Sequence, residues 1–431
     1  MNKRNKIVNP TKFVKGQITL PGDKSISHRT LLFAALAKGK SKIKFLNNGA
    51  DVLSTIVCLQ KLGIKFQLGR YSVEVDSPGF NKWNRKISGS INCGNSGTTT
   101  RLLAGLVAGQ GIDVKMIGDE SLNARPMKRI IDPLREMGAD IESNDGKLPM
   151  TFHVSKLKGI RYTLPIASAQ VKSCLLFAGL FADRKTYITE KTPTRDHTEN
   201  MMKIFGISIF KKKDVISVNK LKRDVIPFKY SVPGDPSAAA FWIAAGLLVP
   251  NSKLTLKRAS LNPSRISYIK LLQKNGCRIR INSINQSLEP FGDILIESSK
   301  IKPFLISRKI AASLIDEIPI LALIATQANG KSTFRGVKEL RHKESDRIKS
   351  IVESLKCLGA DIKEYHDGFD IFGPTKLKGN TVDSYGDHRI AMMLSIAGLI
   401  SNSPVKIKNH SIVNISYPDF YGILKRISRK R

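Results

Sequence analysis

The chain has 431 residues, of which 41% are hydrophobic and 25% charged, and its net charge is +36 at neutral pH. No apolar run reaches the roughly 18–20 residues of a membrane-spanning helix, and the N-terminus lacks the apolar segment of a secretory signal. Five cysteines are scattered singly, without a metal-binding spacing. The composition therefore predicts a soluble, reduced, cytoplasmic protein with about two to three domains' worth of core, no membrane segment and no structural metal.

The basic excess raises the hypothesis of a nucleic-acid-binding protein, which would show a salt-dependent gel shift. However, the lysines and arginines are spread along the whole chain and form no stripe interleaved with aromatic residues. We interpret most of the excess as a solvated surface that also attracts anions. The expected partners are small anionic molecules and not nucleic acid.

One segment type occurs six times, at intervals of roughly 65–85 residues, which is typical of a repeated supersecondary unit. Each copy is a short polar cluster followed by a run rich in Ala, Leu and Ile, and this pattern predicts a buried helix that begins at the cluster. The copies begin at Asp23, Gly94, Ala167, Pro233, Ile315 and Gly386. Helix N-termini attract anions, so six such starts that face one cleft would bind a multiply anionic substrate.

A second segment type alternates with the first, and it predicts an amphipathic helix, a glycine at positive φ and a short strand. Its copies begin at Leu59, Leu134, Met202, Leu271 and Leu355. A sixth amphipathic helix opens at Phe420, but the chain ends before its strand. The N-terminal stretch that ends in QITLPG at Gly22 is a candidate for the missing strand.

Six units divide naturally into two similar α/β (α+β) domains of three repeats each. The first domain is expected over residues 21–230. The second is expected over residues 1–20 and 231–431, because the SVPGDP segment at Ser231 has the prolines and glycine of a crossing. An active site would then belong at the interface between the domains.

Two glycine-containing motifs open predicted helices of the first domain. In PGDKSISHR, Ser25 or Ser27 is a possible cap, and Lys24 and Arg29 suit a phosphate or carboxylate. In GNSGTTTR, Gly97 would let a ligand approach the backbone closely, although the motif is neither a Walker loop nor GxGxxG. Taken alone, either motif also fits an ordinary helix cap with exposed charges.

Two further motifs place arginines near helix starts. Arg125 precedes Pro126, so it is extended and could fork onto a carboxylate or phosphate. In ELRHKESDR, a helix would bring Lys343, Glu344 and Arg347 onto neighbouring faces. Glu344 would then be a proton donor or acceptor held between cations. The alternatives are a surface arginine and a salt-bridged helix start.

Acidic residues open the last two buried helices. Asp316 and Glu317 precede a wholly apolar run, where a carboxylate is costly unless it caps the helix or has a function, and capping explains only one of the two. Asp387 and Arg389 flank His388 at the last start. A metal site is not expected there, because no second His or Cys lies at ligand spacing.

With these motifs in place, the chain resembles the 5-enolpyruvylshikimate-3-phosphate (EPSP) synthase family over nearly its full length. The strings that carry the resemblance are PGDKSISHR, GNSGTTTR, GDESLNARPM, SAQVKS, TRDHTE, VPGDPSAAAF, DEIP, KESDR and GDHRIAM, in the family's order. SAQVKS and TRDHTE are similar to the branch called class II. The resemblance implies two domains of three βαβαββ repeats with buried parallel helices, an inside-out α/β barrel with the active site in the interdomain cleft.

The family's reaction moves the enolpyruvyl group of phosphoenolpyruvate to the 5-hydroxyl of shikimate 3-phosphate by addition and elimination, on the route to chorismate and the aromatic amino acids. The resemblance implies no metal, no cofactor and a monomer. By motif, the residues implied to hold shikimate 3-phosphate are Lys24, Ser25, Arg29, Ser168, Gln170, Arg195, Asp316 and Lys343. Those implied to hold phosphoenolpyruvate are Lys24, Gly97, Arg125, Gln170, Arg347 and Arg389.

The resemblance also implies catalytic roles for three of these motifs. Asp316 would take the hydroxyl proton, Glu344 would protonate the methylene carbon, and Lys24 would stabilise the departing phosphate. Whether Lys24 or Glu344 makes the first proton transfer stays open.

The chain departs from its relatives at a few positions. Ile415 stands where many relatives have Lys, so one cationic contact with phosphoenolpyruvate is in doubt. Gly97 is retained where glyphosate-insensitive class II members often carry Ala, so we predict sensitivity to glyphosate. The sister family, UDP-N-acetylglucosamine enolpyruvyl transferase, usually has a reactive Cys in the loop that matches GDESLNARPM, which has none here.

Overall fold

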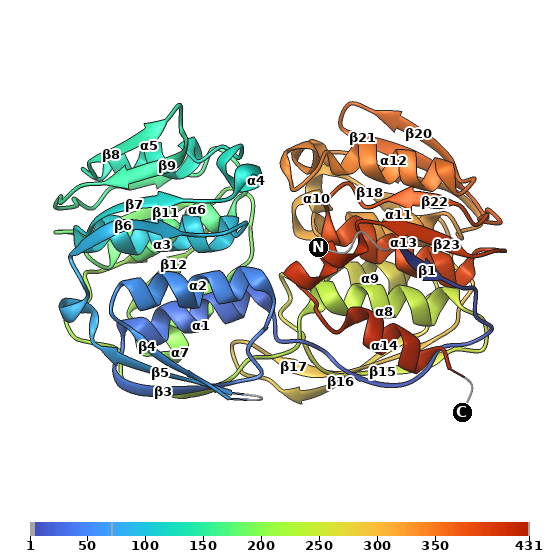
Figure 1. Cartoon of the computed structure of the whole chain (residues 1–431), viewed down its shortest axis with the longest axis horizontal. Coiled ribbons are helices and arrows are strands. Elements are labelled where there is room, and N and C mark those ends of the chain that lie inside the picture. The colour runs from blue at the N-terminus through green and yellow to red at the C-terminus, as the bar shows by residue number, and fades with distance from the viewer. Residues whose placement is uncertain (1–4, 70–71, 430–431) are drawn as a thin grey trace. The chain divides into compact units, whose positions relative to one another are not determined.

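The computed structural model describes residues 5–69 and 72–429, so residues 1–4 of the predicted second domain lie outside the described residues. The chain divides into two compact units, Gly22–Val232 and Met1–Pro21 with Pro233–Arg431. Each unit has a hydrophobic core of its own. Each also repeats a helix–strand–helix–hairpin unit, so the predicted class of two inside-out α/β domains is confirmed (Figure 1).

The unit Gly22–Val232 has three four-stranded sheets, with strand orders β14-β3-β5-β4, β6-β7-β9-β8 and β10-β11-β13-β12. The strands are β3 (Lys38–Lys44), β4 (Lys65–Leu68), β5 (Ser72–Pro78), β6 (Lys86–Asn92), β7 (Asp113–Ile117), β8 (Ile141–Asn144), β9 (Lys147–Phe152), β10 (Arg161–Thr163), β11 (Thr186–Thr189), β12 (Ile209–Lys212), β13 (Val215–Val218) and β14 (Lys229–Ser231). In each sheet the first two strands are parallel and the other pairs are antiparallel.

Helices fill the space between these sheets. In Figure 1 the strands β3–β5 (blue) and β8–β9 (teal) lie at opposite ends of the unit, with α1 and α3 between them. The buried helices are α1 (Lys24–Leu36), α3 (Gly97–Gln110) and α6 (Ala169–Gly179), and the amphipathic ones are α2 (Ala50–Lys61), α5 (Lys128–Glu136) and α7 (His197–Ile204). Two short helices, α4 (Glu120–Asn123) and η1 (Phe80–Lys82), complete the unit. A Cβ atom on Gly105 of α3 would lie 2.1 Å from the carbonyl oxygen of Cys174 of α6, so this glycine is what lets the two buried helices pack closely.

The other unit repeats the plan with sheets β16-β17-β15-β2, β18-β19-β21-β20 and the three-stranded β1-β23-β22. Its strands are β1 (Lys6–Val8), β2 (Lys15–Thr19), β15 (Lys253–Ser260), β16 (Ile279–Asn285), β17 (Phe291–Glu297), β18 (Leu305–Ile306), β19 (Gly330–Phe334), β20 (Asp361–Tyr365), β21 (Gly368–Gly373), β22 (Thr381–Asp383) and β23 (Val405–Lys408). Strands such as β17 alternate buried and half-buried residues, because one face packs on helices and the other faces solvent.

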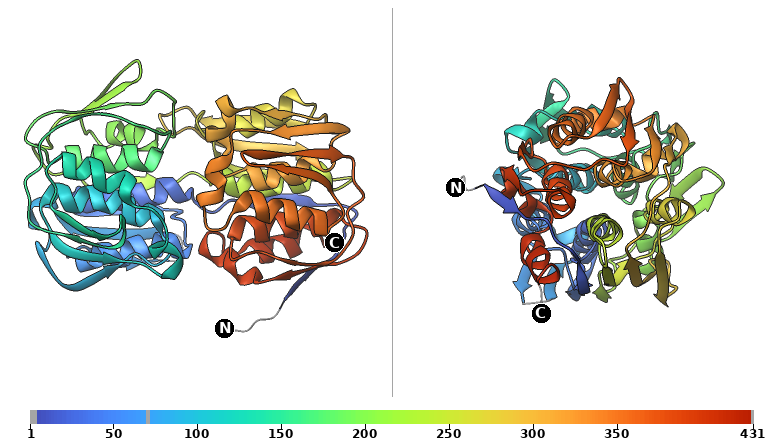
Figure 2. Two further views of the ribbon diagram at one scale, coloured as in Figure 1. Left: turned by 90° about the horizontal axis from the view of Figure 1, so that it is seen from above. Right: turned by 90° about the vertical axis from the view of Figure 1, so that its right-hand side faces the viewer.

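The helices of this unit lie inside its strands, and the right-hand view of Figure 2 shows them end-on. The buried ones are α8 (Pro236–Leu248), α11 (Ile318–Ala325) and α13 (His388–Ile400), and the amphipathic ones are α9 (Ser267–Lys274), α12 (Arg347–Cys357) and α14 (Phe420–Ile427). The remaining ones are α10 (Arg308–Leu314), η2 (Lys338–His342) and η3 (His410–Ile415). Thus all six predicted polar clusters do precede buried helices. Among the described residues, no helix combines the length and apolar character that a membrane span requires.

The N-terminal stretch divides between two sheets, which the sequence reading did not foresee. The QITL segment lies in and just after β2, which runs parallel to β15, so it does not close the sixth sheet. That place is taken by β1, which pairs antiparallel with β23. In each of the other sheets the strand in the place of β23 pairs with a later hairpin strand, whereas here β1 pairs with that edge of β23 and satisfies its backbone groups.

The glycines after the amphipathic helices have the predicted left-handed conformation. Gly63, Gly138, Gly206, Gly276 and Gly359 have φ between 75° and 96°. Each therefore turns the chain sharply from a helix toward the strand that follows it.

Candidate active site

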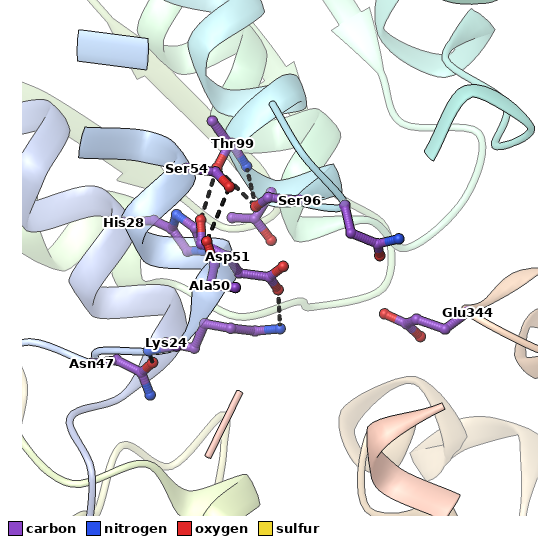
Figure 3. Close-up of polar contacts among 12 residues, drawn as sticks. Lys24, His28, Asn47, Ala50, Asp51, Ser54, Ser96, Thr99 and Glu344 are labelled. Carbon is purple, nitrogen blue, oxygen red and sulfur yellow. Dashed lines mark hydrogen bonds and ion pairs between the residues drawn. The ribbon is translucent and has the colours of Figure 1, made fainter. Parts of the chain in front are cut away.

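The starts of α1 and α2 are joined by an ion pair. Asp23 caps α1 by accepting a hydrogen bond from the Ile26 N–H at 2.8 Å, so the cap is neither Ser25 nor Ser27 as predicted. Lys24 is the first helical residue, and its Nζ lies 2.7 Å from Oδ2 of Asp51 on α2 (Figure 3). Both side chains are largely buried, at 18% and 10% exposure, so this lysine is held by a defined partner.

A chain of hydroxyl groups runs from this pair to a buried histidine. The Thr99 hydroxyl contacts the Asp51 carbonyl oxygen at 3.2 Å and the Thr55 hydroxyl at 2.8 Å, and Thr55 contacts Nδ1 of His28 at 2.7 Å. The Thr99 hydroxyl also contacts the hydroxyl of Ser96, the N-cap residue of α3 (Figure 3). Burial lowers the pKa of His28 to about 3, so His28 is neutral and structural in this network.

Arg29 is buried and donates hydrogen bonds from all three of its guanidinium nitrogens. Its Nε donates to the Thr198 hydroxyl at 2.7 Å, one terminal nitrogen donates to the Ser173 hydroxyl at 2.8 Å, and the other donates to the Ser25 carbonyl at 2.9 Å. These bonds join α1, α6 and α7. The guanidinium of Arg29 is therefore fixed before any ligand binds. The other arginine of this region, Arg195, lies half-buried on the loop just before α7.

A second polar group joins α3 to α6. The carbonyl oxygen of the Gln170 side chain accepts from Arg101 at 2.8 Å, and its amide nitrogen donates to Thr98 at 2.9 Å. Ser168 caps α6 by accepting a hydrogen bond from the Val171 N–H. The starts of α1 and α3 thus carry the charged residues that the sequence pattern predicted, and the start of α6 carries the Gln170 amide.

Gly97 opens α3 beside two arginines. A Cβ atom at this position would lie 2.7 Å from a terminal nitrogen of Arg101 and 3.5 Å from one of Arg125. Arg125 donates to the Asn95 side chain at 2.8 Å and contacts the Ser121 hydroxyl. The missing side chain therefore leaves room for both guanidinium groups at this helix start.

In the other unit, Arg347 is the centre of an acidic cluster. It is 1% exposed, its Nε lies 2.7 Å from Oδ2 of Asp387, and one terminal nitrogen lies 2.6 Å from Oε2 of Glu344. The other terminal nitrogen lies 3.6 Å from Oδ1 of Asp316. Burial lowers the pKa of Arg347, but Asp387 and Glu344 raise it by more, so the pKa is well above its usual value.

The carboxylate of Asp316 lies between two guanidinium groups, because Arg389 approaches its Oδ2 at 3.6 Å. The neighbouring Glu317 turns away into the core, where it accepts a hydrogen bond from the Ser237 hydroxyl at the start of α8. The two acidic residues therefore differ in role. Asp316 is partly accessible, and Glu317 joins two buried helices.

The segment with Lys343 and Glu344 is not helical, so the helix predicted through ELRHKESDR is wrong. The 3-10 helix η2 ends at His342, and α12 begins only at Arg347. The reason is that the Asp346 side chain caps α12 by accepting from the Lys349 N–H at 3.1 Å, and a capping residue favours extended backbone. Burial lowers the pKa of Lys343, which Asp316 partly opposes.

The ion pairs of Asp51 and of the buried Lys172 were not predicted from the sequence. Asp51 contacts a residue 27 positions away, and Lys172 contacts Glu190 and Glu199. The signal for Lys172 was a lysine inside an apolar run. Among the described residues of either unit taken alone, no three His, Cys, Asp or Glu side chains converge closely enough to hold a metal.

Comparison with known proteins agrees with this arrangement. The model of the family described as EPSP synthase (3-phosphoshikimate 1-carboxyvinyltransferase) matches residues 8–424. A 3-phosphoshikimate 1-carboxyvinyltransferase of Thermodesulfovibrio yellowstonii is 44% identical, over 99% of this chain and 100% of its own length. One from Bacillus subtilis is 42% identical, over 96% and 97%.

Solved structures give the same answer. An EPSP synthase from Acinetobacter baumannii superposes with a TM-score of 0.88 at 36% identity and covers 98% of both chains. The enolpyruvyl transferase NikO of Streptomyces tendae, at 14% identity and a TM-score of 0.76, shares the fold. The family and the enzyme class predicted from the sequence are therefore confirmed, and the chain belongs to the EPSP synthase (3-phosphoshikimate 1-carboxyvinyltransferase) family.

Proposed function

We propose that this chain transfers the enolpyruvyl group of phosphoenolpyruvate to the 5-hydroxyl of shikimate 3-phosphate and releases phosphate. The observation that supports the proposal best is the cluster in which Arg347 contacts the carboxylates of both Asp316 and Glu344. An addition and an elimination that each move a proton need two positioned carboxyl groups. Anionic substrates also need cations held in place beforehand.

The substrate contacts are proposed from the family motifs. Shikimate 3-phosphate would be held by Lys24, Ser25, Arg29, Ser168, Gln170, Arg195, Asp316 and Lys343. Phosphoenolpyruvate would be held by Lys24, Gly97, Arg125, Gln170, Arg347 and Arg389. The domain Gly22–Val232 would be the shikimate 3-phosphate side. The donors fixed at the starts of α1, α3 and α6 support this assignment, because phosphate groups prefer helix N-termini with adjacent cations.

In the addition step, Asp316 would take the proton of the 5-hydroxyl as its oxygen attacks C2 of phosphoenolpyruvate. At the same time Glu344 would deliver a proton to the methylene carbon, which becomes a methyl group. The product is a tetrahedral intermediate that still carries the phosphate. The guanidinium groups of Arg347 and Arg389 would balance its negative charge.

In the elimination step, the bond between C2 and the phosphate oxygen breaks, and a methyl proton returns to Glu344. Lys24 would stabilise the departing phosphate. Its ion pair with Asp51 supports this role, because the paired ammonium is held in one position and not spread over many rotamers.

The reaction is tested by measuring phosphate release from phosphoenolpyruvate with and without shikimate 3-phosphate, and with UDP-N-acetylglucosamine as a control acceptor. Release that requires shikimate 3-phosphate supports the proposal. Release only with the UDP-sugar moves the chain to the sister family, and no release with either acceptor refutes the proposed activity.

The base is tested with Asp316→Asn and Asp316→Ala. Both should lower single-turnover rates by about 10²–10⁴-fold, the usual range for a positioned acid or base, with much smaller changes in the dissociation constant of shikimate 3-phosphate. An unchanged rate in both variants would remove Asp316 from this role. Because the structure already engages Arg29 in three hydrogen bonds, Arg29→Lys is a better test of substrate binding than Arg29→Ala.

We propose further that the enzyme acts as a monomer in the cytoplasm without a cofactor. Sedimentation equilibrium of the active protein tests the first point. Dialysis against a chelator, which should leave the rate unchanged, tests the last.

A further inference from the structure

Lys172 lies on α6, within the core of the unit Gly22–Val232. Its side chain has no exposed surface. Its Nζ lies 2.9 Å and 3.1 Å from the two carboxylate oxygens of Glu190 and 2.6 Å from Oε1 of Glu199. The two glutamates are 3% and 6% exposed. One ammonium and two carboxylates therefore share a site from which water is almost excluded.

The two glutamates stand at opposite ends of one loop. Glu190 directly follows β11, and Glu199 is in the first turn of α7. Residues 191–196, between β11 and α7, have no regular structure, and they include Arg195. Because Lys172 contacts both ends, it fixes the separation of β11 and α7 and so the path of the loop between them.

Glu190 also holds the loop from within. Its Oε1 accepts hydrogen bonds from the backbone N–H of Thr194, at 3.0 Å, and from the Thr194 hydroxyl. Thr194 immediately precedes Arg195. Glu190 therefore contacts both Lys172 and Thr194, the residue next to Arg195.

We call Lys172, Glu190 and Glu199 the clamp. The residues next to Lys172 and Glu199 in the sequence contact a second arginine, Arg29. Ser173 follows Lys172, and Thr198 precedes Glu199. The hydroxyls of Ser173 and Thr198 contact each other at 2.7 Å, and both accept hydrogen bonds from Arg29. A shift of α7 relative to α6 would therefore move the partners of Arg29 as well.

Three buried charges are a poor way to gain stability, because desolvation offsets the attraction and apolar residues of the same shape often do as well. A buried polar network is better suited to fixing one geometry. We infer that Lys172, with Glu190 and Glu199, is a positioning residue that orients Arg195 and the partners of Arg29 toward the phosphate of shikimate 3-phosphate. The inference rests on the proposed function for the identity of that ligand.

The test uses Lys172→Met, which keeps the length of the side chain, and a double-mutant cycle with Arg195→Ala. The dissociation constant of shikimate 3-phosphate is measured by calorimetry without phosphoenolpyruvate. We expect Lys172→Met to weaken binding about tenfold. The continuous contact through Glu190 and Thr194 makes Arg195 the main route, so adding Lys172→Met to the Arg195→Ala variant should weaken binding by less than about twofold more. Fully additive losses would overturn the inference.

Lys172→Met leaves two carboxylates buried without their cation, so it can fail to fold. A second variant, Lys172→Met with Glu190→Gln and Glu199→Gln, removes all three charges and keeps their shapes. It should fold, bind shikimate 3-phosphate as weakly as Lys172→Met, and show amide hydrogen exchange over residues 191–196 that is at least tenfold faster. Native affinity with native exchange in this variant would overturn the inference.

The control is Lys331→Met, which removes a half-exposed lysine from the buried carboxylate of Asp370 in the other unit, where Arg335 still pairs with Asp370. It should change the melting temperature but not the affinity for shikimate 3-phosphate. Hydrogen exchange needs no substrate, so it separates the two proposals. If the wild-type enzyme does not bind shikimate 3-phosphate but exchange rises as expected, the proposed function fails while the clamp stands.

Discussion

Replacing Asp387 with alanine removes the carboxylate that holds Arg347 in the core. Asp387 has no exposed surface, contacts Nε of Arg347 at 2.7 Å and one terminal nitrogen at 3.3 Å, and caps α13 through the Arg389 N–H at 2.8 Å. Removing one partner of a buried pair costs about 3–5 kcal/mol, and losing the cap costs about 1 kcal/mol. Because Glu344 still contacts Arg347, we expect a total of about 3–5 kcal/mol.

That loss applies to the unit Met1–Pro21 with Pro233–Arg431, which has roughly 220 residues. At about 2–4 °C per kcal/mol for a unit of this size, its melting temperature should fall by roughly 6–20 °C in scanning calorimetry. Asp387→Asn keeps a good capping residue and loses the charge, so the difference between the two variants isolates the cap.

Asp383→Ala is the control, because Asp383 is a half-buried acid at the end of β22, four residues before Asp387, that accepts hydrogen bonds from the Tyr385 N–H and the Asn409 side chain. It should cost less than about 1 kcal/mol. Arg347 freed from Asp387 should also raise the KM for phosphoenolpyruvate more than that for shikimate 3-phosphate. A melting temperature of Asp387→Ala within about 2 °C of the wild type would refute the reasoning that this pair is central to the unit.

Three further predictions concern pH and ligand binding. Because burial lowers the pKa of His28 to about 3, the unfolded state binds a proton first as the pH falls below 6.5, so His28 should cost about 2 kcal/mol of stability between pH 7 and pH 5. Urea unfolding should show this loss in the wild type but not in His28→Gln, and equal losses would exclude His28 as the cause. Burial also lowers the pKa of Lys343, so as the pH rises the affinity for shikimate 3-phosphate should begin to fall at a pH below the pKa of a free lysine. Lys343→Arg, which stays charged, should abolish this transition. If the wild type and Lys343→Arg show the same dependence of this affinity on pH, Lys343 is not the titrating group. Gly97→Ala places a Cβ atom 2.7 Å from Arg101, so it should raise the KM for phosphoenolpyruvate several-fold and the inhibition constant of glyphosate by more; a wild-type enzyme that glyphosate does not inhibit would contradict this prediction.

The repeated helices could be predicted from the sequence because their signals are local. A capping residue such as Ser96 or Asp235 stands directly before an apolar run, and the cap and the run together determine where the helix begins. The same holds for the glycines after the amphipathic helices, since a positive φ is a property of one residue.

What could not be predicted depends on partners that are distant in sequence. Nothing near Lys24 indicates that Asp51, 27 positions away, is its partner. The division of the N-terminus between β1 and β2 likewise depends on the open edge of β23, near the far end of the chain. In ELRHKESDR the helical spacing was present, but the cap by Asp346 and the bonds from Arg341 to Asp346 and Glu364 outweigh it.

The net charge of +36 also has a structural explanation. Several buried cations are paired with acids, as Lys172 is with Glu190 and Glu199 and Arg347 is with Asp387, so they contribute little to the field outside. Exposed lysines lie instead on solvent-facing strands, and β3 alone presents them at alternate positions from Lys38 to Lys44, of which Lys40 pairs with Glu74. Charges on such faces are screened within roughly 8 Å at physiological salt. Recognition of two small anions therefore depends on the few cations that neighbouring side chains fix in position, such as Lys24 and Arg29, and the composition as a whole says little about the site.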